Sequence, residues 1–272
     1  MRIGKKEFQV PGHTYVMGIL NVTPDSFSDG GKFNDPDQAL FRVEQMIAEG
    51  VDLIDLGGES TKPGTDYGAL TPGEETERVV PVIEKIRERF DIPLSLDTYH
   101  SETAKAGIAA GVDMINDVWG LKFDPQMAKV IAEAGVACCL MHNRKEAVYD
   151  NFINDVTSDL AECIRLAEEA GIADNKIILD AGIGFGKTYE QNLRLLNVLE
   201  EFHMFGYPVL LGASRKSVIG DTLQLPVDER LEGTIATSVV AAMKGCSFVR
   251  VHDVKANVRA LKMTEAILHA GK

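Results

Sequence analysis

Eight short runs rich in β-branched and other apolar residues recur along the chain, and they limit its fold more than any other feature. These predicted strands span residues 15–21, 51–56, 93–98, 114–118, 137–142, 176–180, 208–212 and 247–252. The segments between them carry apolar residues three and four positions apart, as in Val79, Val82, Ile83 and Ile86, which predicts amphipathic helices. A strand followed by a helix, repeated along the whole chain, indicates an α/β fold with a parallel sheet.

The predicted helices also carry end signals. A glycine stands between helix and strand at five places, and glycine takes the left-handed backbone conformation that ends a helix without steric cost. These residues are Gly50, Gly111, Gly135, Gly171 and Gly245. Asp124 followed by Pro125 predicts a helix start, with the aspartate as N-cap and the proline at the first helical position.

Eight strands with their helices, in a chain near the typical length of about 250 residues, fit a single closed (β/α)8 TIM barrel better than an open doubly wound sheet. The open sheet is the competing interpretation, and it places a glycine-rich nucleotide-binding turn after its first strand. Here Asn21-Val-Thr-Pro-Asp25 occupies that place. Because no linker, low-complexity tract or block of charge divides the chain, we expect one domain spanning residues 1–272.

The composition argues against two classes of partner. A net charge of −13 and a pI near 4.9 disfavour nucleic-acid binding, which needs a clustered basic surface. No apolar run reaches the roughly 18 residues of a membrane span, and the mixed residues of Met1–Gly12 do not fit an export signal, so we expect a cytoplasmic protein. The four cysteines lack metal-binding or redox spacing and are expected to be buried thiols.

Polar residues stand where the predicted strands end. In a barrel of this kind the chemistry lies at the C-terminal ends of the strands, so these residues predict a functional site there. At any one position the alternative is a cap for the following helix. The residues are Asn21, Asp55, Asp97, Asn116, Asp117, His142, Asp180, Ser214, Lys216, Arg250 and His252.

Two of the predicted loops are unusually long. The loops at residues 22–35 and 57–73, after the first and second strands, exceed the usual strand-to-helix connection. They are dense in hydroxyl, amide and carboxylate groups, whereas a loop that only turns the chain needs glycine, proline, asparagine or aspartate at one or two positions. We therefore expect both loops to take part in binding.

A glycine-rich segment, Asp180-Ala-Gly-Ile-Gly-Phe-Gly-Lys-Thr188, resembles a phosphate-binding loop but does not match one. The Walker pattern needs glycine where Ala181 stands, and the glycine spacing is not that of a dinucleotide-binding turn. The segment instead predicts a compact turn that lets Asp180 and Phe185 face a bound ring.

Several segments together resemble the motifs of dihydropteroate synthases, the folate-pathway enzymes that join a pterin diphosphate to para-aminobenzoate. They are Gly18–Gly30, Asp55–Gly64, Ser95-Leu-Asp-Thr98, Ile115-Asn-Asp117, Met141-His142, the glycine-rich segment, Gly212-Ala-Ser-Arg-Lys-Ser217 and Arg250-Val-His252. The resemblance covers almost the whole chain. It implies the same barrel, the same condensation of 6-hydroxymethyl-7,8-dihydropterin diphosphate with para-aminobenzoate, a homodimer, and sulfonamide competition at the para-aminobenzoate site.

The resemblance implies a pterin site in the mouth of the barrel. Its residues would be Asp97, Asn116, Met141, Asp180, Phe185, Gly212 and Lys216. Carboxylates, an amide and an ammonium suit the alternating donors and acceptors of a 2-amino-4-oxo heterocycle, and Met141 and Phe185 would contact its faces. The alternative for Met141 and Phe185 is ordinary filling of the barrel.

By the same resemblance, Asn21, Arg250 and His252 would bind the diphosphate. The planar guanidinium of Arg250 suits phosphate oxygens. Mg²⁺ would be the cofactor, held by Asn21 and the diphosphate while keeping most of its waters. The predicted catalytic set consists of the three diphosphate residues and three pterin residues. Its members are Asn21, Arg250, His252, Asp97, Asp180 and Lys216. For His252 the alternative is a hydrogen-bonded structural histidine.

Para-aminobenzoate would lie against Thr61, Pro63 and Ser217. Lys62 departs from the arginine that is usual in this S-T-R-P-G run, and it keeps the charge without the bidentate fork. Further departures from the family pattern are Trp119, Asn143 and Ala181, the last in place of a proline.

The implied mechanism is dissociative, because an aromatic amine is a weak nucleophile and loss of diphosphate should precede its attack. No nucleophilic side chain is required. A pterin-binding methyltransferase acting on a corrinoid protein is one alternative, although it would have no use for the diphosphate residues. A barrel that only binds a metabolite is another, although it would not need Asn21, Lys216 and Arg250 together.

Overall fold

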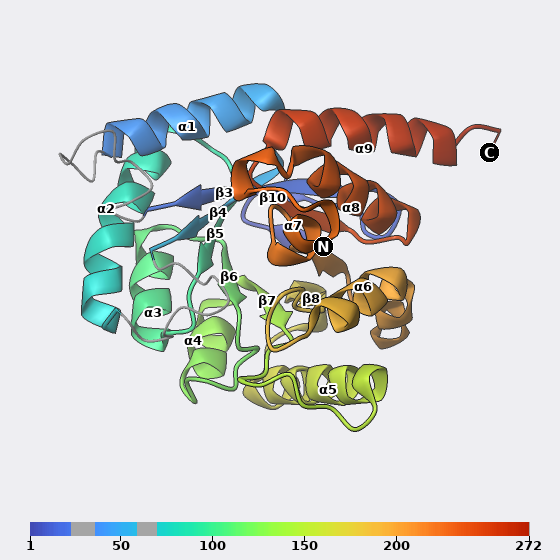
Figure 1. Cartoon of the computed structure of the whole chain (residues 1–272). Coiled ribbons are helices and arrows are strands. Elements are labelled where there is room, and N and C mark those ends of the chain that lie inside the picture. The colour runs from blue at the N-terminus through green and yellow to red at the C-terminus, as the bar shows by residue number, and fades with distance from the viewer. Residues whose placement is uncertain (23–35, 59–69, 272) are drawn as a thin grey trace.

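The computed structural model describes residues 1–22, 36–58 and 70–271, and eight of its strands form a closed barrel (Figure 1). Neighbouring strands in the barrel run parallel, in the closed order β10-β3-β4-β5-β6-β7-β8-β9. The strands are β3 (Tyr15–Asn21), β4 (Leu53–Gly57), β5 (Leu94–Asp97), β6 (Met114–Asp117), β7 (Ala137–Met141), β8 (Ile177–Asp180), β9 (Val209–Leu211) and β10 (Phe248–Val251). The predicted TIM barrel is confirmed, and all eight predicted strands lie within two residues of the observed ends.

Helices surround this barrel on its outer side (Figure 1). They are α1 (Pro36–Glu49), α2 (Pro72–Arg89), α3 (Ser101–Ala110), α4 (Met127–Ala134), α5 (Phe152–Ala170), α6 (Tyr189–Asn197), α7 (Ser217–Leu223), α8 (Leu231–Met243) and α9 (Val254–Leu268). Short 3-10 turns lie at Asp174–Lys176, Leu199–Phe205 and Val227–Glu229. Within the described ranges, no helix is long and apolar enough to cross a membrane.

The helix ends agree with the sequence in all but one case. All five predicted glycines have a positive φ, from 64° at Gly135 to 114° at Gly111. The predicted start at Asp124 is wrong, because α4 begins at Met127. Asp124 instead accepts hydrogen bonds from Gln126 N and from Ser101 N, the latter at the first residue of α3.

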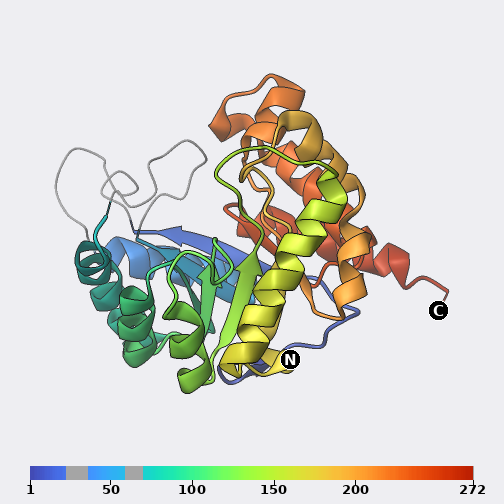
Figure 2. The ribbon, with the colours of Figure 1, turned by 90° about the horizontal axis from the view of Figure 1, so that it is seen from below.

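An N-terminal hairpin closes the bottom of the barrel, and the sequence did not predict it. It consists of the antiparallel strands β1 (Arg2–Ile3) and β2 (Lys6–Glu7). Figure 2 shows the N-terminus below the green strand arrows, at the end away from their heads. Ile3 and Phe8 are buried against the interior side chains Tyr15, Met17 and Phe248. The apolar interior is thus sealed at the end opposite to the strand C-termini.

Candidate functional site

The mouth of the barrel is lined by side chains that the alternation of the strands selects. Successive residues of a strand point to opposite faces, and the interior is filled by Leu53, Met114, Cys139, Ile178, Leu210 and Phe248. Two residues farther along the same strands or just past their ends stand Asp55, Asn116, Met141, Asp180, Gly212 and Arg250. The apolar interior therefore gives way to a polar layer at the C-terminal ends.

One half of this layer is a buried network around Arg250. Its Nε donates to Asp55 Oδ2 at 2.5 Å, and one Nη donates to Asp97 Oδ2 at 2.7 Å. Asn116 Nδ2 also donates to Asp55 Oδ2, at 3.1 Å. Asp55 is fully buried and was not among the predicted binding residues. Its signal in the sequence was its position two residues after the inward-facing Leu53.

Two carboxylates share one guanidinium in this network, so one negative charge is left uncompensated in a buried place. Burial raises the pKa of Asp97 to about 7, and this effect outweighs the opposing attraction of Arg250. Asp55 Oδ1, Asp97 Oδ1 and Ser95 Oγ are buried and have no hydrogen-bond partner among the described residues. Buried polar atoms of this kind normally have partners, so the mouth is suited to a polar ligand.

The other half of the layer contains Asp180 and Lys216, whose charged groups both lie near Gly212. A Cβ placed on Gly212 would lie 3.4 Å from Asp180 Oδ2 and 3.9 Å from Lys216 Nζ, so both groups approach the glycine. Lys216 Nζ donates to the carbonyl of Ile183 at 2.5 Å and lies 4.5 Å from the centre of the Phe185 ring. Burial lowers the pKa of Lys216 to about 8 and raises that of Asp180, while each charge opposes the shift of the other.

Apolar side chains form a separate small cluster at the mouth. Met141 and Phe185 are buried there with Tyr99, Val118 and Trp119, and this cluster is distinct from the one that fills the barrel interior. The positions of Met141 and Phe185 beside Asp180 and Lys216 agree with contact to a flat ring. Trp119, a departure from the family pattern, thus belongs to the wall of the same pocket.

His252 lies at the end of β10, directly before α9. The Nδ1 atom of His252 is 2.9 Å from Ser214 Oγ. The same Oγ accepts a hydrogen bond from the backbone N–H of His252 at 3.2 Å. Burial is the main cause that lowers the pKa of His252 to about 4, so the ring is neutral at pH 7. The first turn of α9 starts two residues later, at Val254, and its backbone amides favour an anion.

The remaining predicted site residues lie at three different places in the chain. Asn21 ends β3, on the same strand face as the interior residue Met17. Ser217 is exposed at the start of α7. Thr61 and Pro63 lie outside the described residues.

Two of the polar strand ends face away from the mouth. Asp117 accepts hydrogen bonds from the backbone N–H groups of Trp119 and Leu121. His142 is fully buried with its Nε2 3.0 Å from Asp159 Oδ2 of α5. These two residues therefore stabilise loops and helix packing, whereas the predicted pterin residues on the strands share the inward face.

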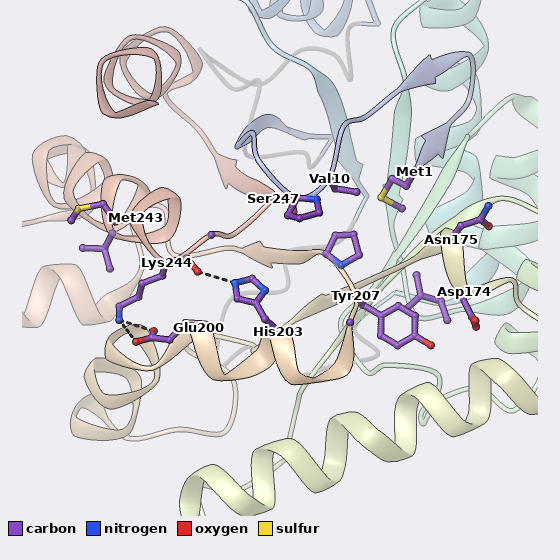
Figure 3. Close-up of a pocket in the computed structure, with 16 residues that line it drawn as sticks. Met1, Val10, Asp174, Asn175, Glu200, His203, Tyr207, Met243, Lys244 and Ser247 are labelled. Carbon is purple, nitrogen blue, oxygen red and sulfur yellow. Dashed lines mark hydrogen bonds and ion pairs between the residues drawn. The ribbon is translucent and has the colours of Figure 1, made fainter. Parts of the chain in front are cut away.

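A cavity of about 1120 Å³ lies at the opposite end of the barrel (Figure 3). Met1, Val10, Tyr207 and Met243 line it, and Lys244 forms an ion pair with Glu200 at its edge. These residues precede the strands or belong to the outer helices. The cavity is therefore separate from the mouth, where the inward-facing carboxylates lie.

The donor groups at the mouth fit a metal ion that is bound mainly through a substrate. Within the described ranges, no cluster of three histidine, cysteine or acidic side chains is placed to cage a metal. The amide of Asn21, at the end of β3, could supply one oxygen ligand. Mg²⁺ commonly takes one or two protein oxygens together with substrate phosphates and water, so this donor set is compatible with it.

Comparisons with known proteins extend over nearly the whole chain. Residues 17–252 match the family model described as pterin binding enzyme. The dihydropteroate synthase of Clostridium beijerinckii is 58% identical over 269 residues, which cover 98% of this chain and 99% of that protein.

Solved structures give the same result. The dihydropteroate synthase of Clostridium difficile, determined in the presence of pteroic acid, has a TM-score of 0.92 and 48% identity, with 96% of this chain and 99% of that chain covered. The Xanthomonas albilineans dihydropteroate synthase with 4-aminobenzoic acid has a TM-score of 0.90 and 42% identity, with 95% and 94% covered.

The raised pKa of Asp97 predicts how stability depends on pH. An unfolded aspartate titrates near pH 3.9, whereas the folded protein holds this proton until about pH 7. Between these values the unfolded chain releases a proton that the folded chain keeps, so stability falls as pH rises. Because asparagine does not titrate, urea unfolding of ligand-free Asp97→Asn between pH 4 and 8 should show a shallower fall than wild type. Equal slopes would contradict this origin of the pH dependence.

Proposed function

The chain belongs to the dihydropteroate synthase family of pterin-binding enzymes, and from this premise we propose how its barrel mouth carries out the reaction. The enzyme is a transferase of folate biosynthesis. It condenses 6-hydroxymethyl-7,8-dihydropterin diphosphate with para-aminobenzoate and releases diphosphate as 7,8-dihydropteroate forms. The observation that carries the proposal is the inward-facing set Asp97, Asn116 and Asp180, with the unpaired buried oxygen of Asp97.

We propose that the pterin ring lies across the two halves of the polar layer. Asp97, Asn116 and Asp180 bind its polar edge, and Lys216 donates to a ring acceptor. Met141 and Phe185 contact its faces, while Gly212 leaves room beside Asp180. The support for this pose is the common inward direction of the strand residues and the position of Phe185 beneath Lys216.

The departing diphosphate is assigned to Asn21, Arg250 and His252. Arg250 has one Nη without a hydrogen bond among the described residues, and its other two nitrogens are held by Asp55 and Asp97. His252 is fixed through its Nδ1 and backbone N–H by Ser214, which leaves Nε2 as the nitrogen available to a ligand. Mg²⁺, when bound to the diphosphate and Asn21, would neutralise part of the charge that develops on the leaving group.

The proposed mechanism is dissociative. Carboxylates at Asp97 and Asp180 favour a ring that gains positive charge as its bond to the diphosphate breaks. Arg250 and His252 hold the leaving group at the other side of the breaking bond. The amine of para-aminobenzoate then attacks the exocyclic methylene and loses its proton. Ser217, Thr61 and Pro63 are proposed to position this second substrate, and only Ser217 lies among the described residues.

We expect the purified chain to release diphosphate only when pterin diphosphate, para-aminobenzoate and Mg²⁺ are all present, with formation of 7,8-dihydropteroate. EDTA should abolish release and added Mg²⁺ should restore it, if the leaving group needs the metal. Coupled detection of diphosphate, with product identified by mass spectrometry, measures this. Unchanged turnover in EDTA would exclude the metal requirement, and absence of dihydropteroate would exclude the reaction.

Asp180→Asn should weaken pterin binding by about 10- to 100-fold, the range expected for a lost hydrogen bond to a charged group. Asp180 Oδ1 already accepts the N–H of Gly182 at 2.7 Å, so an amide would face either this donor or the ring donor with its own NH₂. Calorimetric titration with a pterin measures the change. Asp91→Asn is the matched control, because Asp91 is 72% exposed and pairs with Lys5 at the other end of the barrel. Affinity like that of wild type in Asp180→Asn would contradict the assignment.

We further propose that the enzyme is a cytoplasmic homodimer. All four cysteines are free thiols and buried, which is usual in a reducing compartment. The adjacent helices α8 and α9 expose large apolar side chains: Met243 is 64% exposed, and Met263 and Ile267 are each 62% exposed. Exposed apolar groups of this kind support a protein interface on these helices.

The dimer is testable by sedimentation equilibrium. We expect a mass twice the 29.7 kDa of the chain, and Met263→Glu should shift the equilibrium toward the monomer because it places a charge among apolar side chains. Phe41→Glu on α1, where the ring is 60% exposed, is a control for an added surface charge. A wild-type mass of one chain at micromolar concentration would contradict the dimer.

A further inference from the structure

Lys187 belongs to the glycine-rich segment after β8, directly after its last glycine, and the mechanism above does not use it. Its Nζ lies 2.8 Å from His142 Nδ1, 2.8 Å from the carbonyl oxygen of Gly182 and 2.9 Å from that of Phe185. A lysine ammonium has three N–H donors and no acceptor. The three acceptors therefore account for all the hydrogen-bonding capacity of the group.

The partners of His142 determine the direction of these hydrogen bonds. Its Nε2 is 3.0 Å from Asp159 Oδ2, a carboxylate that also accepts from Arg144 Nε at 2.6 Å. A carboxylate requires a proton on Nε2, and burial lowers the pKa of His142 to about 4, so the ring is neutral. Nδ1 is then an acceptor, and Lys187 donates to it. Burial lowers the pKa of Lys187 well below its ordinary value, while Asp180 and Asp159 oppose that effect. The three acceptors around Nζ favour the charged form, because only an ammonium has three N–H donors.

The two carbonyls that Lys187 holds belong to the loop that forms one wall of the pterin site. The N–H of Gly182 donates to Asp180 Oδ1, and the carbonyl of Ile183 accepts from Lys216. The ring of Phe185 lies under the ammonium of Lys216. Lys187 thus binds the carbonyls at both ends of the four-residue segment 182–185, and the N–H of Phe185 also donates to the carbonyl of Gly182, at 3.2 Å.

The backbone of the loop packs closely at Gly182, where only glycine fits. A Cβ on Gly182 would clash with the carbonyl oxygen of His142, and Gly182 has a φ of 72°. The outer part of the loop has other supports, because Asn192 Oδ1 accepts from Gly184 N and Tyr149 donates to the carbonyl of Gly186. Among the described residues, only Lys187 bridges the carbonyls of Gly182 and Phe185.

We propose that Lys187 is a positioning residue for the pterin: with His142 and Asp159 behind it, its ammonium holds the 182–185 segment so that Asp180, Phe185 and Lys216 meet the ring. The inference rests on the proposed pterin-binding roles of those three residues. Lys187 itself does not contact the substrate. Its loss should therefore reduce pterin affinity while leaving the diphosphate site, which is built from other strands, intact.

The test compares Lys187→Met with wild type by calorimetric titration of two separate ligands, a pterin without diphosphate and inorganic diphosphate with Mg²⁺. Methionine keeps the length of the side chain and removes the charge. We expect pterin affinity to fall about tenfold or more, as for loss of charged hydrogen bonds, and diphosphate affinity to stay within about twofold. Lys129→Met makes the same change at a side chain that is 66% exposed, and it should alter neither affinity.

The single tryptophan gives a second readout. Trp119 shares a buried cluster with Phe185 and Met141, so displacement of Phe185 in ligand-free Lys187→Met should shift its fluorescence emission relative to wild type and Lys129→Met. If Lys187→Met does not fold, Lys187→Gln replaces it, since a shorter amide can still donate to one carbonyl. An intermediate loss of pterin affinity is then expected.

Pterin affinity like that of wild type in a folded Lys187 variant would overturn the inference. So would an equal loss of pterin and diphosphate affinity, which would indicate a general structural role. If wild type binds no pterin, the proposed function fails and this inference fails with it. If Asp180→Asn binds pterin normally, the proposed role of Asp180 fails, and this inference, which rests on that role, fails with it. Normal behaviour of those two proteins with an unaffected Lys187→Met would reject the positioning role alone.

Discussion

Closing eight parallel strands into a barrel sends every second side chain toward one axis, and most other features depend on this constraint. In the lower layers the axis is filled by apolar side chains and sealed by the N-terminal hairpin through Ile3 and Phe8. This apolar filling lies below the upper layer, where Asp55, Asp97 and Arg250 are buried together. Charged groups in such a place are costly unless paired, so the spare carboxylate favours a ligand that brings donors to it.

The sequence was sufficient for the architecture because its signals are local and repeated. Each strand is a nearly continuous apolar run, since parallel strands are covered on both faces, and most of the runs end at glycine or at a polar residue. It was also sufficient for the family, because the residues at the strand ends are specific in type and spacing. The hairpin was missed for the same reason: two-residue strands such as Arg2–Ile3 contain no measurable period.

The direction of side chains was harder to predict, because it depends on exact register. A shift of one residue moves a side chain to the other face, and strand ends cannot be located that closely from sequence. Asp117 and His142 stand at strand ends as Asp97 and Asp180 do, yet Asp117 binds the backbone of the following loop and His142 contacts Asp159 of α5. Asp55 is the opposite case. It lies inside the barrel and accepts a hydrogen bond from Arg250, although no sequence pattern distinguished it from a helix cap. Only the three-dimensional structure of the barrel shows which of these residues point to the axis and which point outward.

The glycine-rich loop illustrates how a departure from the family pattern can be tolerated. Proline before Gly182 would restrict the backbone in the unfolded and folded chain alike, and Ala181 does not. In this structure the conformation of the loop is instead stabilised by side chains that bind its backbone. Lys187 donates to two carbonyls, Asn192 accepts from one N–H, and Tyr149 donates to a further carbonyl. Ala181 is itself buried. A loop fixed by contacts of this kind does not need a rigid residue at its start, so alanine there is consistent with a well-formed pterin wall.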